Sequence, residues 1–145
     1  MKEILGPNDL KPFLSRYLMD GLRHEHLEIK KVVIARDEIS CVVANQNRYH
    51  HFTVPSALLV VSQLAIIYGC WDHRLDAKQG EHLLRHFSIK CKRQLSQPEV
   101  HFSLQLRSKR RRNRFVFYSG DFAIGDDDFV GEASFVMPFP DENHT

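Results

Sequence analysis

The residues best suited to do chemistry form a short run, residues 49–53 (Tyr-His-His-Phe-Thr), directly ahead of a long apolar segment. The run places a phenol, two imidazoles and a hydroxyl before a predicted helix, in which Thr53 can act as N-cap and Pro55 is tolerated in the first turn. A helix N-terminus presents unpaired N–H groups and a partial positive charge, which can polarise a carbonyl or stabilise an oxyanion. We therefore expect a site at this helix entrance, where His51 orients or activates a water molecule, although His51 could also be only a packed residue.

Three polar side chains interrupt the apolar helix, and buried polar groups need hydrogen-bond partners. Gln63 lies seven residues after Ser56 and therefore on nearly the same face. Ser56 and Ser62 can bond back to helical carbonyls as readily as they can line a cavity, and Thr53 can serve only as a cap. Because an amide is costlier to bury, we expect Gln63 to face a site or a subunit interface.

The apolar segment that carries these residues spans residues 54–71, close to the shortest length of a membrane-spanning helix. Pro55 near its start and Gln63 at its middle argue against contact with lipid. A helix that is apolar all round in a soluble protein is enclosed on most sides. We therefore predict a buried central helix over residues 53–71 and no membrane partner.

Hydrophobic periodicity predicts the remaining elements. Apolar residues recur at helical spacing over residues 9–22, with Gly21 as a plausible stop. Alternating or continuous apolar runs predict a hairpin over residues 28–44 and strands over residues 83–92, 101–107, 115–124 and 129–137. Residues 109–114 are predicted to form a basic turn, and residues 138–145 a flexible tail.

This order of elements predicts a single α+β domain over residues 1–145. An antiparallel sheet that is long enough to curl can wrap one apolar helix and bury it. The expected architecture is the hot-dog fold, a curled antiparallel β-sheet wrapped around one long buried helix. A ferredoxin-like fold would require a second helix between the later strands.

Composition narrows the class of protein. The 145 residues are 43% hydrophobic and 26% charged, which is typical of one soluble globular domain and excludes a disordered chain. A net charge of +2 makes no case for nucleic acid as a partner. Cys41, Cys70 and Cys91 have no metal-ligand spacing and no secretion signal precedes them, so we expect buried, reduced thiols in a cytoplasmic protein without metal or cofactor.

Residues 51–65 (HFTVPSALLVVSQLA), residues 91–95 (CKRQL) and the last hairpin resemble the FcoT-like long-chain acyl-CoA thioesterases of the hot-dog superfamily, over about residues 33–137. In that family a His-Phe-Asn triplet opens the central helix, an Asn-Gln pair follows, and a tyrosine stands eight residues before the triplet's asparagine. At these spacings the chain has residues 51–53 (His-Phe-Thr), residues 62–63 (Ser-Gln) and Asn45, with Tyr49 nearby.

The resemblance implies catalytic roles for the residues at those positions. Backbone N–H groups after Thr53 are expected to polarise a thioester carbonyl, and Gln63 with Ser62 to fix the water or the carbonyl. Asn45 takes the tyrosine's place, and Tyr49 and Ser56 are expected to contact the substrate. The resemblance also implies a homodimer or higher homo-oligomer with its sites at the interface, which would cover exposed sheet edges.

A second resemblance is to the β-hydroxyacyl-carrier-protein dehydratases, which combine a histidine at this helix with a helix aspartate or glutamate. The chain has no carboxylate between Phe52 and Trp71. Two-group proton transfer therefore lacks a partner unless Asp72 or another subunit supplies it. Thioester hydrolysis is favoured; a dehydratase, a related lyase or a non-catalytic acyl-binding subunit are the alternatives.

The strongest charge feature is the basic run at residues 109–114 (KRRRNR). It can be a solvated turn, and it lacks the interleaved aromatic residues that single-stranded nucleic acid requires. Arginines also suit the phosphates of coenzyme A or the acidic helix of an acyl carrier protein. Arg110, Arg111 and Arg112 are therefore the predicted landing site for one of these thioester carriers.

Overall fold

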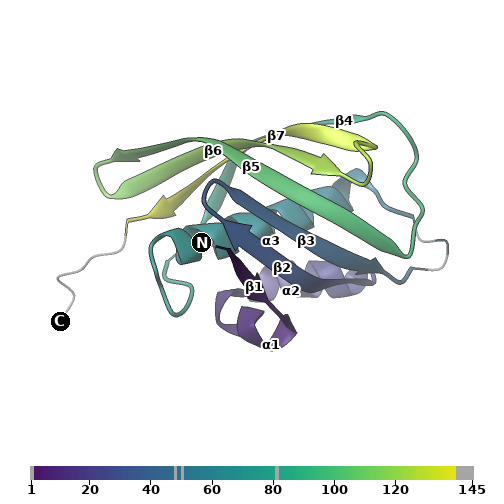
Figure 1. Cartoon of the computed structure of the whole chain (residues 1–145), viewed down its shortest axis with the longest axis horizontal. Helices are drawn as coiled ribbons and strands as arrows, with labels where there is room; N and C mark the ends of the chain where they lie inside the picture. Colours follow the sequence, from purple (N-terminus) through teal and green to yellow (C-terminus); the bar gives the residue numbers. More distant parts are fainter. Residues whose placement is uncertain (1, 48, 50, 81, 140–145) are drawn as a thin grey trace.

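A curled antiparallel sheet wrapped over one long helix forms the body of the protein (Figure 1). The computed structural model describes residues 2–47, 49, 51–80 and 82–139. In this part of the chain the strands are β1 (Glu3–Leu5), β2 (Leu27–Ala35), β3 (Glu38–Asn45), β4 (Leu83–Cys91), β5 (Glu99–Arg112), β6 (Phe115–Ile124) and β7 (Phe129–Pro138). The helices are α1 (Pro7–Leu10), the 3-10 turn η1 (Lys11–Phe13), α2 (Arg16–His24) and α3 (Val54–Asp72).

The sheet order is β1-β2-β3-β5-β6-β7-β4, and each neighbouring pair is antiparallel. Alternate residues of β5 (Val100, Phe102, Leu104 and Leu106) are buried against the helix, while the residues between them are exposed or half-buried. This period-two pattern is that of a strand with one face on the core. The predicted hot-dog architecture is therefore confirmed.

The central helix α3 begins one residue after Thr53, whose side chain accepts the N–H of Ser56 at 3.4 Å. By length and composition α3 could cross a membrane, but 67% of its most apolar window is buried inside the protein. Because the sheet and the N-terminal helices enclose it, the helix is apolar nearly all round. Its exposed positions are few and lie at helical spacing, Val54 and Leu58 among them.

The helix expected over residues 9–22 is divided into α1, η1 and α2. Pro12 has no backbone N–H to continue a helix, and Leu14 takes an extended conformation with ψ of 133°. Gly21 does not stop α2, which continues to His24. A side chain at Gly21 would come within 2.8 Å of Leu59 on α3, so this glycine instead permits close packing of the two helices.

The basic turn predicted at residues 109–114 is wrong, because β5 continues through Arg112. Residues 108–112 pair with residues 115–119 of β6 beyond a bulge between Leu106 and Ser108. The turn itself is Asn113 and Arg114, and Asn113 has a positive φ of 57°. The strongly β-forming partner strand (Phe-Val-Phe-Tyr) therefore draws the arginines into the sheet.

Strand β4 forms one edge of the sheet and pairs only with β7 among the described strands. Most of its residues are exposed, including Leu83 at 59%. The expectation that all three cysteines are buried is therefore wrong for Cys91, which ends this edge strand and is exposed. Cys41 and Cys70 are buried, and burial raises the pKa of the Cys70 thiol to about 11. Of the tail, residues 140–145 lie outside the described residues.

Candidate active site

The loop before α3 is held by the side chain of Asn47, which binds the backbone of His51 twice. Asn47 Oδ1 accepts the His51 N–H at 2.6 Å, and Asn47 Nδ2 donates to the His51 carbonyl oxygen at 2.6 Å. The same Nδ2 donates to Asn45 Oδ1 at 2.5 Å. Asn45 is fully buried at the end of β3, and its own N–H donates to the Pro98 carbonyl. The sheet therefore fixes the position of His51 through two asparagines.

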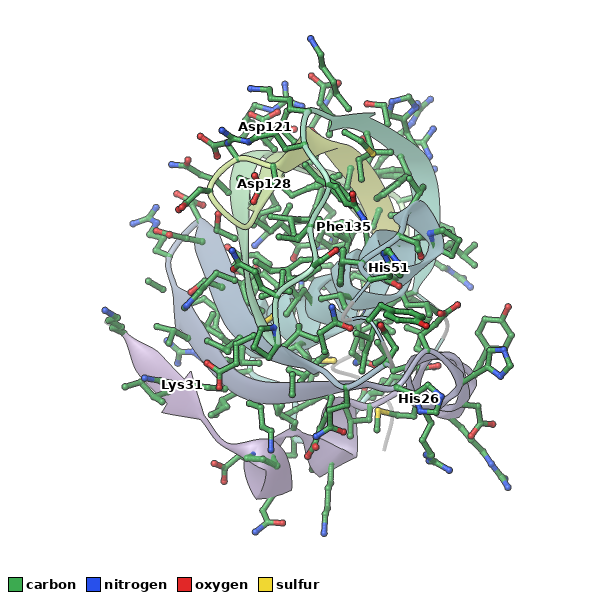
Figure 2. All side chains as sticks on the ribbon, turned by 90° about the vertical axis from the view of Figure 1, so that its right-hand side faces the viewer. His26, Lys31, His51, Asp121, Asp128 and Phe135 are labelled. Carbon is green, nitrogen blue, oxygen red and sulfur yellow. The ribbon has the colours of Figure 1, made fainter. Side chains whose placement is uncertain are left out.

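The His51 ring itself is exposed and contacts two side chains among the described residues. Gln94 Nε2 lies 3.4 Å from His51 Nδ1, and the Tyr49 ring meets the imidazole edge-on at 5.9 Å. A hydrogen bond at one ring nitrogen decides which nitrogen carries the proton. Gln94 is therefore the described side chain placed to influence which nitrogen of His51 carries the proton. Figure 2 looks onto this end of the molecule, where His51 and Asp128 are labelled.

The loop that carries Gln94 is anchored on both sides. Asp128 lies in the turn between β6 and β7. Its backbone carbonyl accepts the N–H groups of Lys92 and Arg93, and its carboxylate accepts a hydrogen bond from Arg93 Nε at 2.8 Å. On the other side, the Leu95 carbonyl accepts the N–H of Phe52 at 3.0 Å. Because Phe52 is buried, this bond joins the Gln94 loop directly to the His51 loop.

The first turn of α3 has one backbone donor to offer a ligand. Pro55 has no N–H, the Ser56 N–H is capped by Thr53 Oγ1, and the Ala57 N–H donates to the Thr53 carbonyl. Within the described part of the chain this leaves the N–H of Val54, a residue that is 40% exposed. The hydroxyls of Thr53 and Ser56 lie 3.0 Å apart and satisfy each other. Thr53 therefore acts as a cap, and the helix dipole acts at Val54.

Gln63 lies away from this loop, ten residues farther along a helix that rises about 1.5 Å per residue. It is fully buried. Its Nε2 donates to the Phe13 carbonyl at 2.9 Å, and its Oε1 accepts the Ser15 N–H at 3.1 Å. Both ends of the amide therefore hold the chain between η1 and α2, which explains why a glutamine stands on an apolar helix.

Ser62 lies on a different face of α3 and lines a cleft of about 270 Å³. The cleft lies between the start of α2, α3 and the edge strand β4, and its walls include Ile66, Leu84 and Phe135. Val54, Leu58 and Ser62 are spaced four residues apart and are all at least partly exposed. They form one stripe that leads from the start of α3 to this cleft.

Arg110, Arg111 and Arg112 are not brought to His51. They lie on the hairpin of β5 and β6, at the end of the molecule where α3 finishes (Figure 1). The 19 residues of α3 separate the two ends by about 28 Å. Successive arginines also point to opposite faces of the sheet, because strand side chains alternate.

A second polar cluster, which the sequence analysis missed, lies beside this hairpin at the end of α3. Asp72 accepts the Tyr118 hydroxyl at 2.6 Å and forms an ion pair with Lys109 at 2.7 Å, and His73 Nε2 lies 3.0 Å from the same hydroxyl. Burial raises the pKa of Asp72, but the bonds from Lys109 and Tyr118 outweigh burial and hold it below its usual value. Burial also lowers the pKa of His73.

No family model matches the chain, and no curated protein matches it in sequence. Solved structures do match. The dehydratase heterocomplex ApeI:P from Xenorhabdus doucetiae is 13% identical, with 92% of each chain covered and a TM-score of 0.63. A mutant of a thioesterase from Pseudomonas aeruginosa is 10% identical, with 84% of this chain and 92% of that chain covered and a TM-score of 0.52.

A protein of unknown function from Chlorobaculum tepidum is 11% identical to the chain, with 92% of this chain and 94% of that chain covered and a TM-score of 0.63. Similarity at such low identity shows the fold. The chain has the hot-dog fold, in the form shared by thioesterases and a dehydratase, as the sequence resemblance predicted.

Proposed function

We propose that this protein hydrolyses acyl thioesters at the start of α3. The observation that supports this most is the fixed position of His51. Asn47 holds its backbone, Gln94 contacts its ring, and it precedes a helix N-terminus with one available N–H group. The addition of water to an activated carbonyl requires at least a base and an oxyanion donor. The exposed imidazole can accept a proton from water, and the N–H group beside it can stabilise the oxyanion that forms.

In the proposed reaction the Val54 N–H binds the thioester oxygen. His51 accepts a proton from water as the water oxygen attacks the carbonyl carbon, and the oxyanion that forms is stabilised by the Val54 N–H and the helix dipole. When the carbon–sulfur bond breaks, His51 returns the proton to the thiolate. The products are a carboxylic acid and a free thiol.

The acyl chain has an apolar path in this proposal. The stripe of Val54, Leu58 and Ser62 runs from the reacting carbonyl to the cleft at Ile66 and Phe135. In this path Ser62 lies beside the chain rather than beside the attacking water. The exposed Tyr49 flanks the entrance, while the buried Ser56, Asn45 and Gln63 support the scaffold.

We propose that a homodimer covers this path. The edge strand β4 leaves Leu83 exposed next to the cleft, and unpaired sheet edges are commonly closed by a second copy. The mass of the 16.9 kDa chain in solution, measured by light scattering, tests this proposal. A monomer at micromolar concentration would contradict it.

The proposed carrier of the acyl group is coenzyme A or an acyl carrier protein. The proposed location is the cytoplasm, where thiols stay reduced; two of the three free cysteines are buried thiols, which supports this location. The proposed hydrolysis requires no cofactor.

The alternative is a dehydratase or related lyase, or an acyl-binding subunit without turnover. One observation favours it: the chain has the fold of a protein in a dehydratase heterocomplex. Asp72, the first carboxylate after residue 53, lies at the far end of α3 and is held by Lys109 and Tyr118. A dehydratase acid would therefore have to come from an element other than α3 or from another subunit.

The test is to incubate the protein with acyl-CoAs of graded chain length and with acyl-carrier-protein thioesters, and to follow the release of free thiol. We expect release with the natural protein and with His101→Ala, which changes an exposed histidine on β5, and loss with His51→Ala. No release from any thioester would contradict hydrolysis. Mass spectrometry of the same samples for gain or loss of water would then identify a hydratase or dehydratase.

A further inference from the structure

A groove of about 410 Å³ lies across β5, β6, β7 and β4, at the end of the molecule opposite His51. Its walls include four arginines from two separate strands, Arg85 on β4 and residues 110–112 on β5. The buried residues Val116 and Tyr118 of β6 face the helix, so their neighbours Phe117 and Ser119 face away from it. The groove therefore lies mainly on the outer face of the sheet, and Arg111 and Tyr118 of the inner face also line it.

The strand register places two kinds of group side by side in this groove. Ser108 pairs with Ser119, and Ser119 pairs with Ser134, which gives a row of three hydroxyls across the sheet. In the next outward row Arg110 pairs with Phe117. The guanidinium of Arg85 lies over the Phe117 ring at 4.9 Å. Hydroxyl donors, guanidinium groups and one flat aromatic surface thus share a single concavity.

Two other basic residues on this hairpin have carboxylate partners. Arg107 binds Asp121 at 3.1 Å and lies 3.9 Å from Glu132. Lys109 binds Asp72. Arg111 also lines the groove, and its guanidinium lies 3.5 Å above the neutral ring of Phe139, which does not neutralise its charge.

By contrast, the structure gives no carboxylate partner, in the described residues, to the four arginines that line the groove, which are Arg85, Arg110, Arg111 and Arg112. Four guanidinium groups without a carboxylate partner around one groove attract an anion of more than one charge. Because the groove is concave and of ligand size, within the usual range of roughly 300–1,000 Å³, it suits a small anion better than the side of a protein helix.

We propose that this groove binds the phosphate groups of a nucleotide. Arginine forks bind phosphate oxygens bidentately. The serine row adds hydroxyl groups, of which those of Ser108 and Ser119 are hydrogen-bonded to each other. The face of Phe117 and the plane of Arg85 offer a stacking surface for a purine ring. Two sources share this chemistry, the nucleotide end of coenzyme A and a free nucleotide. The coenzyme A source rests on the function proposed above.

The groove and the proposed active site lie at opposite ends of α3 in one protomer. In a dimer, the groove of one protomer can bind the nucleotide of a thioester whose acyl group enters the active site of the other protomer. When two β4 edges pair antiparallel around a two-fold axis, the Arg85 end of one strand lies beside the Cys91 end of the other. The loop of the partner's Gln94 begins there. The groove of one protomer would therefore hold the nucleotide while the thioester enters the partner's site.

The experiment measures equilibrium binding of four probes to the full-length protein by calorimetry: coenzyme A, adenosine 3′,5′-bisphosphate, ATP and inorganic phosphate. We expect the bisphosphate and coenzyme A to bind with similar affinity, and inorganic phosphate at least about tenfold more weakly. The variants Arg85→Ser and Arg110→Ser should each weaken nucleotide binding by about tenfold or more, which is the usual size of a lost charge-assisted hydrogen bond. Arg114→Ser, in the adjacent turn and outside the groove, is the matched control and should bind normally.

Each outcome decides one point. Equal losses in Arg85→Ser and Arg114→Ser, or no loss in either, would overturn the groove as a site. Equal binding of inorganic phosphate and the bisphosphate would overturn the nucleotide assignment. Tighter binding of ATP than of coenzyme A would support the groove with a free nucleotide as its source. Nucleotide binding without any thioester turnover would support the groove and contradict the proposed function.

Discussion

The side chain of Asn47 binds both the N–H and the carbonyl oxygen of His51, each at 2.6 Å. The side-chain amide of Asn47 therefore takes the place of two backbone hydrogen-bond partners. It fixes the loop that carries His51, the proposed base. We expect Asn47→Ala to lower the stability by about 1–3 kcal/mol, since three groups lose a partner, and to lower turnover by more than tenfold. Thermal unfolding and thiol release measure the two effects. Gln46→Ala, at the exposed neighbouring position, is the control and should change neither.

The proposed roles at the helix entrance can be separated by two variants. His51→Ala removes a general base and should lower turnover roughly a hundred- to ten-thousandfold while the melting temperature stays constant, because the ring is exposed. Thr53→Ala removes a cap and should lower the stability by about 1 kcal/mol with a smaller loss of turnover, because the Val54 N–H remains. Near-native turnover in a folded His51→Ala protein would place the active site elsewhere.

In the proposed site Gln94 is a positioning residue for His51, so its replacement should change the pH dependence of turnover. Gln94→Glu puts a negative charge about 3.4 Å from His51 Nδ1 and stabilises the imidazolium form. The acidic limb of the pH–rate profile should therefore move to higher pH. Gln94→Ala should lower turnover without this displacement. Identical profiles for the natural protein and Gln94→Glu would show that the two side chains do not interact during catalysis.

Gln63 is expected to affect folding rather than turnover. Gln63→Ala leaves the Phe13 carbonyl and the Ser15 N–H without their partner, and each buried unpaired group costs roughly 1–3 kcal/mol. We expect a fall in the midpoint of urea unfolding, with native turnover per folded molecule. Ser62→Ala changes the adjacent residue and should leave the midpoint unchanged. A loss of turnover at native stability would instead assign Gln63 to the site.

The parts of this fold that the sequence predicts are those fixed by local pattern. The apolar run of α3 and the alternation in β5 to β7 each depend on a few consecutive side chains, and Thr53 was identified as the cap from its position alone. The basic strand at residues 108–112 was missed because it is polar on both faces. It is a strand because it pairs with residues 115–119, and this pairing cannot be recognised from the basic residues alone.

The site was predicted in part for the same reason. His51 and the start of the helix are adjacent in sequence. The Gln94 contact with His51 joins residues 43 positions apart, and the Gln63 bond to Phe13 spans 50. Such contacts follow from the tertiary structure. A glutamine on an apolar helix indicates a distant partner, but the helix pattern does not say whether that partner is a substrate or a backbone carbonyl.

The cluster of Asp72, His73, Tyr118 and Lys109 predicts how stability depends on pH. Burial lowers the pKa of His73, so the folded protein resists protonation there and loses stability as pH falls below about 6.5. For Asp72 burial favours protonation, but the bonds from Lys109 and Tyr118 hold its pKa below 3.8. The stability that this carboxylate contributes is therefore present above pH 4 and lost as pH falls through its pKa in the folded state.

Melting temperatures measured from pH 8 down to pH 3 should fall in two steps. His73→Phe should remove the step near pH 6, and Asp72→Asn should lower stability at neutral pH while flattening the acid step. A natural protein whose melting temperature is constant from pH 8 to pH 5 would contradict the buried, neutral state of His73.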